Sequence, residues 1–201
     1  MFETAVKNIR SVADTLVDVG TREDLLAATK QCLAERGYAR TTVRDIVAAS
    51  GANLAAINYH FGTRDKLLNQ AMLESTAAAV EQLLGALPED DTSAAAERLN
   101  AFWHKLIESF DADRALWAAN IESGAQAMHS PELAAETGAA QQKAREGLAQ
   151  ILGEGDPAIG AVLQTLIGGL LVQYLIEPQR APTAGDLTAG IRGLARLLGP
   201  S

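Results

Sequence analysis

The sequence of 201 residues has a single cysteine, few aromatic residues and few prolines. One cysteine, Cys32, excludes an intramolecular disulfide and fits a reducing compartment such as the cytoplasm. Cys32 lies at helical spacing from Leu25, Ala28 and Thr29, so we predict a small core residue rather than a redox sensor. Aromatic residues make up 4% of the chain and the six prolines fall mostly near expected loops, which leaves long stretches open to helix.

Sequence motifs of catalysis and metal binding are also missing. The three histidines are scattered, and no HExxH, GxSxG or phosphate-binding glycine loop occurs. His104 and Glu108, one helical turn apart, would suit a metal pair or a general base, but an exposed ion pair is the commoner meaning of that spacing. We therefore expect no catalytic residues, no metal and no cofactor, and predict that the chain is not an enzyme.

What the sequence does contain favours helix almost throughout. Alanine and leucine are abundant and runs of β-branched residues are rare. With 48% hydrophobic and 21% charged residues, the chain has a globular composition and can bury a core. We predict an all-α fold. Residues 1–20 contain acids and no continuous apolar run, so we expect an N-terminal extension with a short helix there, not a signal peptide.

Residues 157–176 carry no charge and are long enough to span a bilayer. Gln164, Thr165 and Gln173 interrupt the apolar run, and acidic residues rather than Lys or Arg flank it, which argues against a membrane anchor. A helix that is hydrophobic all round can instead be buried between two protomers. We therefore expect no membrane association.

Residues 41–68 carry the sequence TTVRDIVAASGANLAAINYHFGTRDKLL, which has the pattern of a helix-turn-helix. A capping box, Thr42 with Asp45, predicts the start of one short helix, and Ser50-Gly51-Ala52 predicts the turn that follows it. Asn53 is expected to cap the second helix of the motif.

Longer helices are predicted on both sides of this motif. A helix over residues 22–36 precedes it, with Gly37 as its stop. Thr63 is expected to cap a long helix over residues 64–87, which would link an N-terminal three-helix head to the rest of the chain.

Residues 21–68 resemble the TetR family of bacterial one-component transcriptional regulators. The likeness is carried by the glycine turn, by the aromatic-His-Phe end of the second motif helix, and by the glycine, Thr63 and basic residue that follow. The chain departs from the family pattern at Asn58, where many relatives have an aromatic residue, and at Arg64, where many have lysine. The resemblance implies a cytoplasmic homodimeric repressor that binds double-stranded DNA at a palindromic operator and is released by a small-molecule effector.

We expect three parts: an extension over residues 1–20, a DNA-binding head over 21–68, and an effector-binding and dimerisation domain over 69–201. Residues 21–69 contain seven Lys and Arg against five Asp and Glu, a net charge of +2, whereas residues 70–201 have a net charge of −9. A mildly basic head on an acidic body is compatible with DNA binding. Because +2 is a weak electrostatic footprint, an alternative stays open: a dimeric small-molecule-binding or adaptor protein whose head is not used.

If the head binds as its relatives do, the helix after the turn lies in the major groove and polar groups around it reach phosphates. The residues predicted to contact DNA are Thr42, Arg44, Asn53, Leu54, Ala55, Ala56, Asn58, Tyr59, His60, Arg64 and Lys66. Leu54, Ala55 and Ala56 have no hydrogen-bonding side chain, so they could contact only thymine methyl groups or fit the groove by shape. Discrimination between sequences would then rest on the two asparagines, on Arg44 and on DNA shape.

Two of these positions need a second interpretation. Leu54 shares a helical face with Ile57 and Phe61, so it fits a core position as well as a base contact. Arg64 and Lys66 lie in the first turn of a helix, where cations oppose the helix dipole, and this mild cost favours phosphate contacts over plain solvation.

The rest of the sequence predicts helices over residues 93–110, 114–128, 131–152, 157–176 and 183–198. In the last of these, Leu187, Ile191, Leu194 and Leu198 form an apolar stripe, and Gly168-Gly169 would allow close approach of the helix before it. We predict a homodimer in which the last two helices of each subunit form a four-helix bundle, although packing within one subunit is the alternative.

The effector is expected to bind between the middle helices, among aromatic residues and a few polar groups. The candidate residues are Phe102, Trp103, Phe110, Trp117, Asn120 and Met128. Aromatic residues at helical spacing also describe an ordinary core, so both interpretations remain open. Effector binding would favour a head spacing that no longer matches half-sites in successive major grooves.

Overall fold

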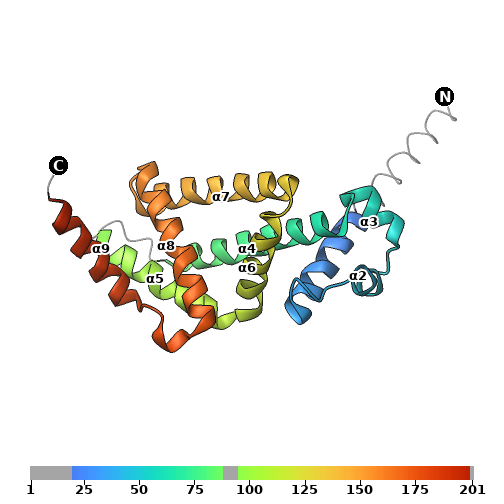
Figure 1. Ribbon diagram of the computed structural model, residues 1–201, viewed down its shortest axis with the longest axis horizontal. Coiled ribbons are helices and arrows are strands. Elements are labelled where there is room, and N and C mark those ends of the chain that lie inside the picture. The colour runs from blue at the N-terminus through green and yellow to red at the C-terminus, as the bar shows by residue number, and fades with distance from the viewer. Residues whose placement is uncertain (1–19, 88–94, 200–201) are drawn as a thin grey trace, which may run out of the picture. The chain divides into compact units, whose positions relative to one another are not determined.

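The computed structural model describes residues 20–87 and 95–199, and within these ranges all regular structure is helical (Figure 1). This confirms the all-α fold. The short helix expected before residue 20 lies outside the described residues. In chain order, a helix over residues 20–36 is followed by α2 (Val43–Ser50), α3 (Leu54–Phe61), α4 (Arg64–Gly85), α5 (Ala95–Ala112), α6 (Arg114–Ala127), α7 (Pro131–Leu152), α8 (Pro157–Ile176), the 3-10 helix η1 (Pro178–Arg180) and α9 (Ala184–Leu198).

Side-chain caps set the starts of these helices, and those at Asn53 and Thr63 are caps that the sequence predicts. The side chains of Asn53, Thr63 and Thr183 accept hydrogen bonds from backbone N–H groups in the first turns of α3, α4 and α9. Thr183 also forms a capping box with Asp186, which places the start of α9 at Ala184. The C-terminal end of α6 differs by one residue from the prediction. The sequence predicts a helix over residues 114–128, whereas α6 ends at Ala127 and Met128 is its C-cap.

The chain divides into two compact units, Met1–Glu74 and Ser75–Ser201, with the boundary inside α4. The predicted boundary at residue 69 lies on the same helix. The buried side chains of the first unit come from all its described helices and include Leu25, Leu33, Ile46, Ile57, Phe61, Leu67 and Leu68. Cys32 is buried among them, and burial raises the pKa of its thiol, which confirms it as a core residue.

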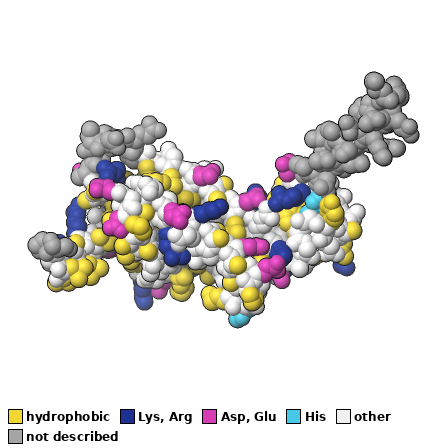
Figure 2. Space-filling view, turned by 90° about the horizontal axis from the view of Figure 1, so that it is seen from above, with side chains coloured by type: hydrophobic (Ala, Val, Ile, Leu, Met, Phe, Trp, Pro, Cys, Tyr) yellow, Lys and Arg dark blue, Asp and Glu magenta, His cyan; other side chains and the backbone are white. Residues whose placement is uncertain are grey.

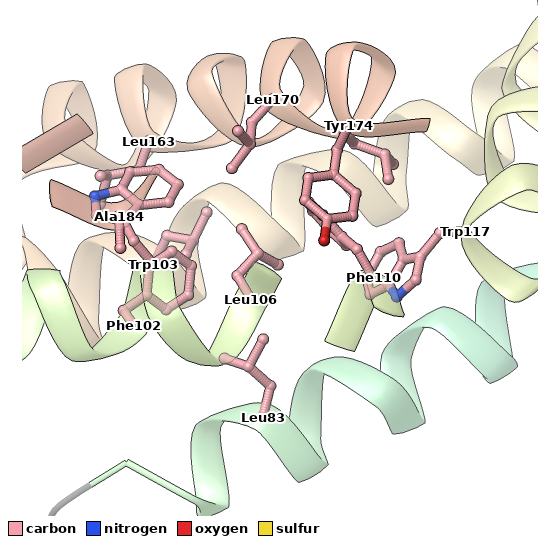
Figure 3. Close-up of a cluster of buried hydrophobic side chains, with 12 residues drawn as sticks. Leu83, Phe102, Trp103, Leu106, Phe110, Trp117, Leu163, Leu170, Tyr174 and Ala184 are labelled. Atoms are coloured by element: carbon pink, nitrogen blue, oxygen red, sulfur yellow. The ribbon is translucent and has the colours of Figure 1, made fainter. Parts of the chain in front are cut away.

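The core of the second unit joins α5, α6 and α8 around a group of aromatic rings (Figure 3). The helices α7 and α8 pack closely, because Gly160 brings the two backbones together. A Cβ atom added at Gly160 would lie 2.2 Å from the carbonyl oxygen of Arg145 on α7. Tyr174 on α8 donates a hydrogen bond of 2.7 Å to the carboxylate of Asp111 on α5, which fixes the other end of α8.

Among the described helices, α8 alone is long and apolar enough to span a membrane by length and composition. One side of α8 is buried inside the unit, through residues that include Leu163, Leu170 and Leu171. The opposite side stays exposed, with Val162 and Val172 on it. The uncharged helix therefore has a packed face and an apolar face that nothing in the described chain covers.

Candidate functional site

The helix-turn-helix has the geometry that its sequence predicts. Gly51 ends α2 with a φ of 69°, and its N–H donates to the carbonyl oxygen of Val47 at 3.0 Å. This left-handed backbone is one that glycine adopts at little cost. The hydroxyl of Ser50 accepts from the Ala52 N–H at 3.2 Å, and Asn53 then starts α3. The two helices are thus joined by three residues that are held by local hydrogen bonds.

The N-terminus of α2 is closed by the predicted capping box. The backbone N–H and hydroxyl of Thr42 donate to one carboxylate oxygen of Asp45 at 2.9 and 2.6 Å, and the Asp45 N–H donates back to the hydroxyl at 3.2 Å. These hydrogen bonds from Thr42 are the main reason that the pKa of Asp45 is lowered, with Arg36, paired at 3.1 Å, adding to the effect. The Thr42 hydroxyl, predicted to contact DNA, is therefore already engaged in the cap.

The exposed face of α3 is formed by Leu54, Ala55, Asn58 and Tyr59. Leu54 is 55% exposed and Tyr59 76% exposed, whereas Ile57 and Phe61 on the same helix are buried. Of the two interpretations of Leu54, the core position is therefore wrong, because the side chain lies on the exposed face of α3. Ala56 and His60 are half-buried at the flank of this face.

Of the two asparagines on or beside this face, Asn53 is committed to the fold. Its side-chain oxygen accepts from the Ala56 N–H at 3.0 Å, so only its amide NH2 group is left for another partner. Asn58 is exposed in the middle of α3. The face therefore presents one asparagine side chain between apolar and aromatic groups.

Arg64 is engaged inside the head. Its Nε donates to the carbonyl oxygen of Thr41 at 2.9 Å, its Nη2 donates to the same oxygen and to that of Tyr38 at 3.2 Å, and its Nη1 pairs with Asp65 at 2.7 Å. Two backbone carbonyls and a carboxylate thus surround the guanidinium. These contacts offset the unfavourable interaction between a cation at this position and the helix dipole.

The other basic side chains of the head differ in their surroundings. Lys30 pairs with Glu74 at 2.7 Å, and Arg22 lies over the ring of Phe61 at 5.3 Å. Arg44, in the first turn of α2, is exposed and makes no ion pair or hydrogen bond within the described ranges. Lys66 is half-buried in the first turn of α4. Arg44 is thus the predicted DNA contact whose charge is most open to solvent.

Four of the six candidate effector residues, Phe102, Trp103, Phe110 and Trp117, meet in the core of the second unit (Figure 3). Their rings form two edge-to-face pairs, with centroids 5.2 Å apart for Phe102 and Trp103 and 5.1 Å apart for Phe110 and Trp117. The structure does not bring Met128 to this group, because it lies at the end of α6 and is 82% exposed.

The polar groups near this core differ in how they are satisfied. The indole Nε1 of Trp117 donates to the Ser109 carbonyl oxygen at 2.9 Å, and Asn120 donates to the Thr76 hydroxyl at 2.9 Å. The indole Nε1 of Trp103 is fully buried and has no hydrogen-bond acceptor in the described part of the chain. Among the described aromatic residues of this core, Trp103 is therefore the one whose N–H or O–H group has no hydrogen-bond acceptor.

His104 and Glu108, whose spacing would suit a metal pair or a general base, do not form such a site in the structure. Glu108 pairs with Lys105 at 2.9 Å, and not with His104, on the exposed side of α5. In residues 20–87 and 95–199, no group of three or more His, Cys, Asp or Glu side chains is placed to hold a metal ion.

Sequence reasoning missed Tyr38 and Thr41, which the structure places at the centre of the head. Both are buried, and burial is the main reason that the pKa of Tyr38 is raised to about 12. The Thr41 hydroxyl donates to the carbonyl oxygens of Cys32 at 3.2 Å and Gly37 at 2.8 Å. No sequence signal could have revealed their link to Arg64, because the acceptors are backbone carbonyls that every residue carries.

Comparisons with known proteins match both parts of the chain. Residues 25–71 match the family described as bacterial regulatory proteins, tetR family, and residues 95–199 match the C-terminal region of BetI-type transcriptional repressors. The HTH-type transcriptional repressor AcnR from Corynebacterium efficiens is 37% identical over 71 residues, which cover 35% of this chain and 38% of that protein. The HTH-type transcriptional regulator TtgR from Pseudomonas putida is 34% identical over 71 residues, covering 35% and 33%. The chain thus spans little more than a third of the length of these relatives.

Among solved structures, the regulator SCO7518 from Streptomyces coelicolor is similar with a TM-score of 0.64. It is 28% identical, and the match covers 90% of this chain and 99% of that one. The match therefore extends through both compact units and is not limited to the helix-turn-helix.

Proposed function

Because this chain belongs to the TetR family of bacterial regulatory proteins, we propose that it is a cytoplasmic repressor that binds a palindromic operator as a homodimer and is released by a small-molecule effector. The family consists of transcriptional regulators and not of enzymes. The observation that carries the proposal is the helix-turn-helix whose second helix, α3, exposes Leu54, Ala55, Asn58 and Tyr59 on one face. A face without buried packing partners on the helix after the turn is what entry into a major groove requires.

We assign base contacts to the exposed side of α3. Leu54 and Ala55 can meet the 5-methyl group of thymine, while the Asn58 amide can pair with the edge of adenine. Asn53 contributes through its free NH2 group only, because its oxygen caps α3. Ala56, half-buried, would set how closely the helix backbone approaches the bases. The half-site would then be rich in A·T pairs.

Replacing single thymines of the operator by uracil removes only the 5-methyl group and so tests this assignment directly. At the contacted position we expect a loss of about threefold to fivefold in affinity, from one buried methyl group. Leu54→Ala should remove the sensitivity to uracil at that position, while Tyr59→Phe should leave it unchanged. Equal affinity for both duplexes at every thymine would show that α3 contacts no methyl group.

Phosphate contacts are assigned to polar groups around α3. Tyr59 is 76% exposed and offers a hydroxyl, and Arg44 offers an exposed charge in the first turn of α2. His60, whose ring meets that of Tyr59 edge-on at 4.9 Å, and Lys66 complete the set, while Thr42 would reach a phosphate only by giving up a hydrogen bond of the capping box. These residues lie on three successive helices of the head, so they could contact the backbone on both sides of a groove.

The homodimer is proposed to form through α8 and α9. The outer side of α8 exposes Val162, Val172 and Ile176, and α9 exposes Leu194 and Leu197. Hydrophobic side chains at the end of the chain's last helix, beside the grey C-terminal residues, are visible in Figure 2. Large exposed apolar side chains gathered on two helices are typical of a surface that a second subunit covers.

The polar groups on the outer side of α8 support the same proposal. The Thr165 hydroxyl donates to the Ala161 carbonyl oxygen at 2.9 Å, and the Gln173 side chain donates to that of Gly169 at 3.3 Å. Because the Thr165 hydroxyl and one N–H of the Gln173 amide are paired within their own helix, burying them costs less than burying unpaired polar groups. A Cβ atom added at Gly168 or Gly169 meets no described atom within 4 Å, so the backbone is accessible to a neighbour.

Light scattering tests the dimer. The protein is expected to have the mass of a dimer at micromolar concentration, and Val172→Arg is expected to give a folded monomer. Met128→Arg, which adds the same charge at the exposed C-cap residue of α6, is the matched control and should remain dimeric. A monomeric wild-type protein would contradict the proposal that α8 and α9 form a dimer interface. Sedimentation of the protein together with lipid vesicles would also contradict it.

The effector is proposed to bind in the second unit, among Phe102, Trp103, Phe110, Trp117 and Asn120. Support comes from the unused indole N–H of Trp103, which is buried among these rings and could donate to a ligand acceptor. Met128 would contribute only if the end of α6 moved toward this group. The effector would act by population shift, binding best to subunits whose heads no longer match successive major grooves.

Selection of bound duplexes from a random library, at low and moderate salt, tests the function as a whole. Enrichment of an inverted repeat is expected, with affinity that falls steeply as salt rises. The double variant Arg44→Gln with Tyr59→Phe should bind the enriched duplex more weakly. A library without any enriched sequence would instead favour a dimeric ligand-binding or adaptor protein whose head is unused.

A further inference from the structure

Arg64 has a position and a set of partners that its place in the sequence does not suggest. It is the first residue of α4, and its side chain is 30% exposed. The guanidinium donates to the carbonyl oxygen of Thr41, 23 residues earlier, and to that of Tyr38, 26 residues earlier. Arg64 thus joins the start of α4 to the segment that runs from Gly37 to Thr42.

This segment sets where α2 begins. Thr41 is fully buried, and its hydroxyl donates to the carbonyl oxygens of Cys32 and Gly37 at the end of the helix over residues 20–36. The next residue, Thr42, is the N-cap of α2. Thr41 is therefore held from one side by the preceding helix and from the other by Arg64, immediately before the helix-turn-helix starts.

The guanidinium is shaped for this contact. Two of its nitrogens, Nε and Nη2, donate to the single oxygen of Thr41, and Nη2 also reaches Tyr38. A lysine keeps the charge but has one nitrogen, so it cannot hold both carbonyls with the same fork. The third nitrogen, Nη1, is paired with Asp65, which neutralises much of the charge that a phosphate would meet.

We propose that Arg64 is a positioning residue, which holds the Tyr38–Thr42 segment and thereby orients α2 and α3, and that it does not contact DNA phosphate. The proposal rests on the DNA-binding function proposed above for the head. Arg44 provides the contrast, because it is exposed and has no ion pair within the described ranges, so it is suited to contact a phosphate.

Affinity for the selected operator duplex, measured by fluorescence anisotropy at several salt concentrations, separates the two roles. For a phosphate contact at Arg44, we expect Arg44→Gln to reduce the salt slope by about 0.9 and Arg44→Lys to restore it. For a positioning role at Arg64, both Arg64→Gln and Arg64→Lys should lose about tenfold in operator affinity while keeping the wild-type slope, from the loss of charged hydrogen bonds. Affinity for an unrelated duplex should change little in the Arg64 variants.

Hydrogen–deuterium exchange of the full chain without DNA tests the positioning role independently of the operator. In Arg64→Lys, the amides of residues 38–45 are expected to exchange faster than in the wild-type protein, while those of α8 keep their rates. Unchanged exchange at residues 38–45, or an Arg64→Lys variant that restores the affinity lost in Arg64→Gln, would overturn the proposal. If the wild-type protein enriched no duplex, the proposed function would fail while the exchange experiment still decided the role of Arg64.

Discussion

Trp103 and Trp117 provide a matched pair for measuring what a buried hydrogen bond contributes to this core. Both indole rings are buried in the second unit, with 0% and 4% of their surface exposed, and each meets a phenylalanine edge-on. The difference lies in the indole N–H. Trp117 donates to the Ser109 carbonyl oxygen at 2.9 Å, whereas Trp103 has no acceptor among the described residues.

Replacing each residue by phenylalanine removes the N–H and a similar part of the ring. The loss of buried ring volume destabilises both variants by comparable amounts, so that contribution largely cancels in the comparison. Trp117→Phe additionally loses a net hydrogen bond, about 1 kcal/mol, whereas Trp103→Phe removes an unsatisfied buried donor, whose burial costs about 1–3 kcal/mol. We therefore expect Trp117→Phe to lower the free energy of unfolding by about 2 kcal/mol or more beyond Trp103→Phe.

Urea unfolding followed by far-ultraviolet circular dichroism measures this difference. The two variants and the wild-type protein are compared at the same protein concentrations, because association of subunits adds to apparent stability. The slope of unfolding free energy against urea concentration should be the same for the three proteins, so that differences between their midpoints report stability alone. Equal destabilisation by the two substitutions would refute the reasoning. It would mean that the Trp103 N–H makes a hydrogen bond that stabilises the fold as much as the one from Trp117 to Ser109.

Three further predictions concern close packing, a helix cap and the cysteine. Gly160→Ala is expected to lower stability by about 1–3 kcal/mol in thermal unfolding, because the added Cβ would lie 2.2 Å from the Arg145 carbonyl oxygen. Since hydrogen bonds from Thr42 lower the pKa of Asp45, the cap should stabilise the fold above the unfolded-state pKa and lose this effect as pH falls through the folded-state pKa. The difference in unfolding free energy between the wild-type protein and Thr42→Ala should therefore be larger at pH 7 than in acid, where only the hydrogen bond from the Asp45 N–H to the Thr42 hydroxyl still separates them; a difference that does not change with pH would contradict this. Because burial raises the thiol pKa of Cys32, iodoacetamide should modify it slowly in the native protein and rapidly in denaturant, and equal rates would place the thiol at the surface.

Much of the fold could be predicted from the sequence because its determinants are local. A capping box joins two side chains three residues apart, so Thr42 with Asp45 indicates a helix start before any tertiary contact is known. The predicted bounds of α7 and α8 agree with the structure, since each helix begins at a proline that follows a capping residue.

Tertiary structure decided what each side chain in the candidate sites contacts. Leu54 is compatible in sequence with a core position and with an exposed one, and in the structure it is 55% exposed while Ile57 and Phe61 on the same helix are buried. The helical spacing of Phe102, Trp103 and Phe110 fits both a ligand site and a core, and the structure packs them together without Met128.

Arg64 shows most clearly where sequence reasoning ends. Its place in the first turn of α4 predicts a cation facing solvent or phosphate, but its partners are carbonyl oxygens 23 and 26 residues away. By itself the sequence determined the helices, their caps and the turn, because these depend on hydrogen bonds between near neighbours. Only the tertiary structure decided which donors meet which acceptors across the head, because backbone carbonyls are identical in every residue and are distinguished only by their position in space.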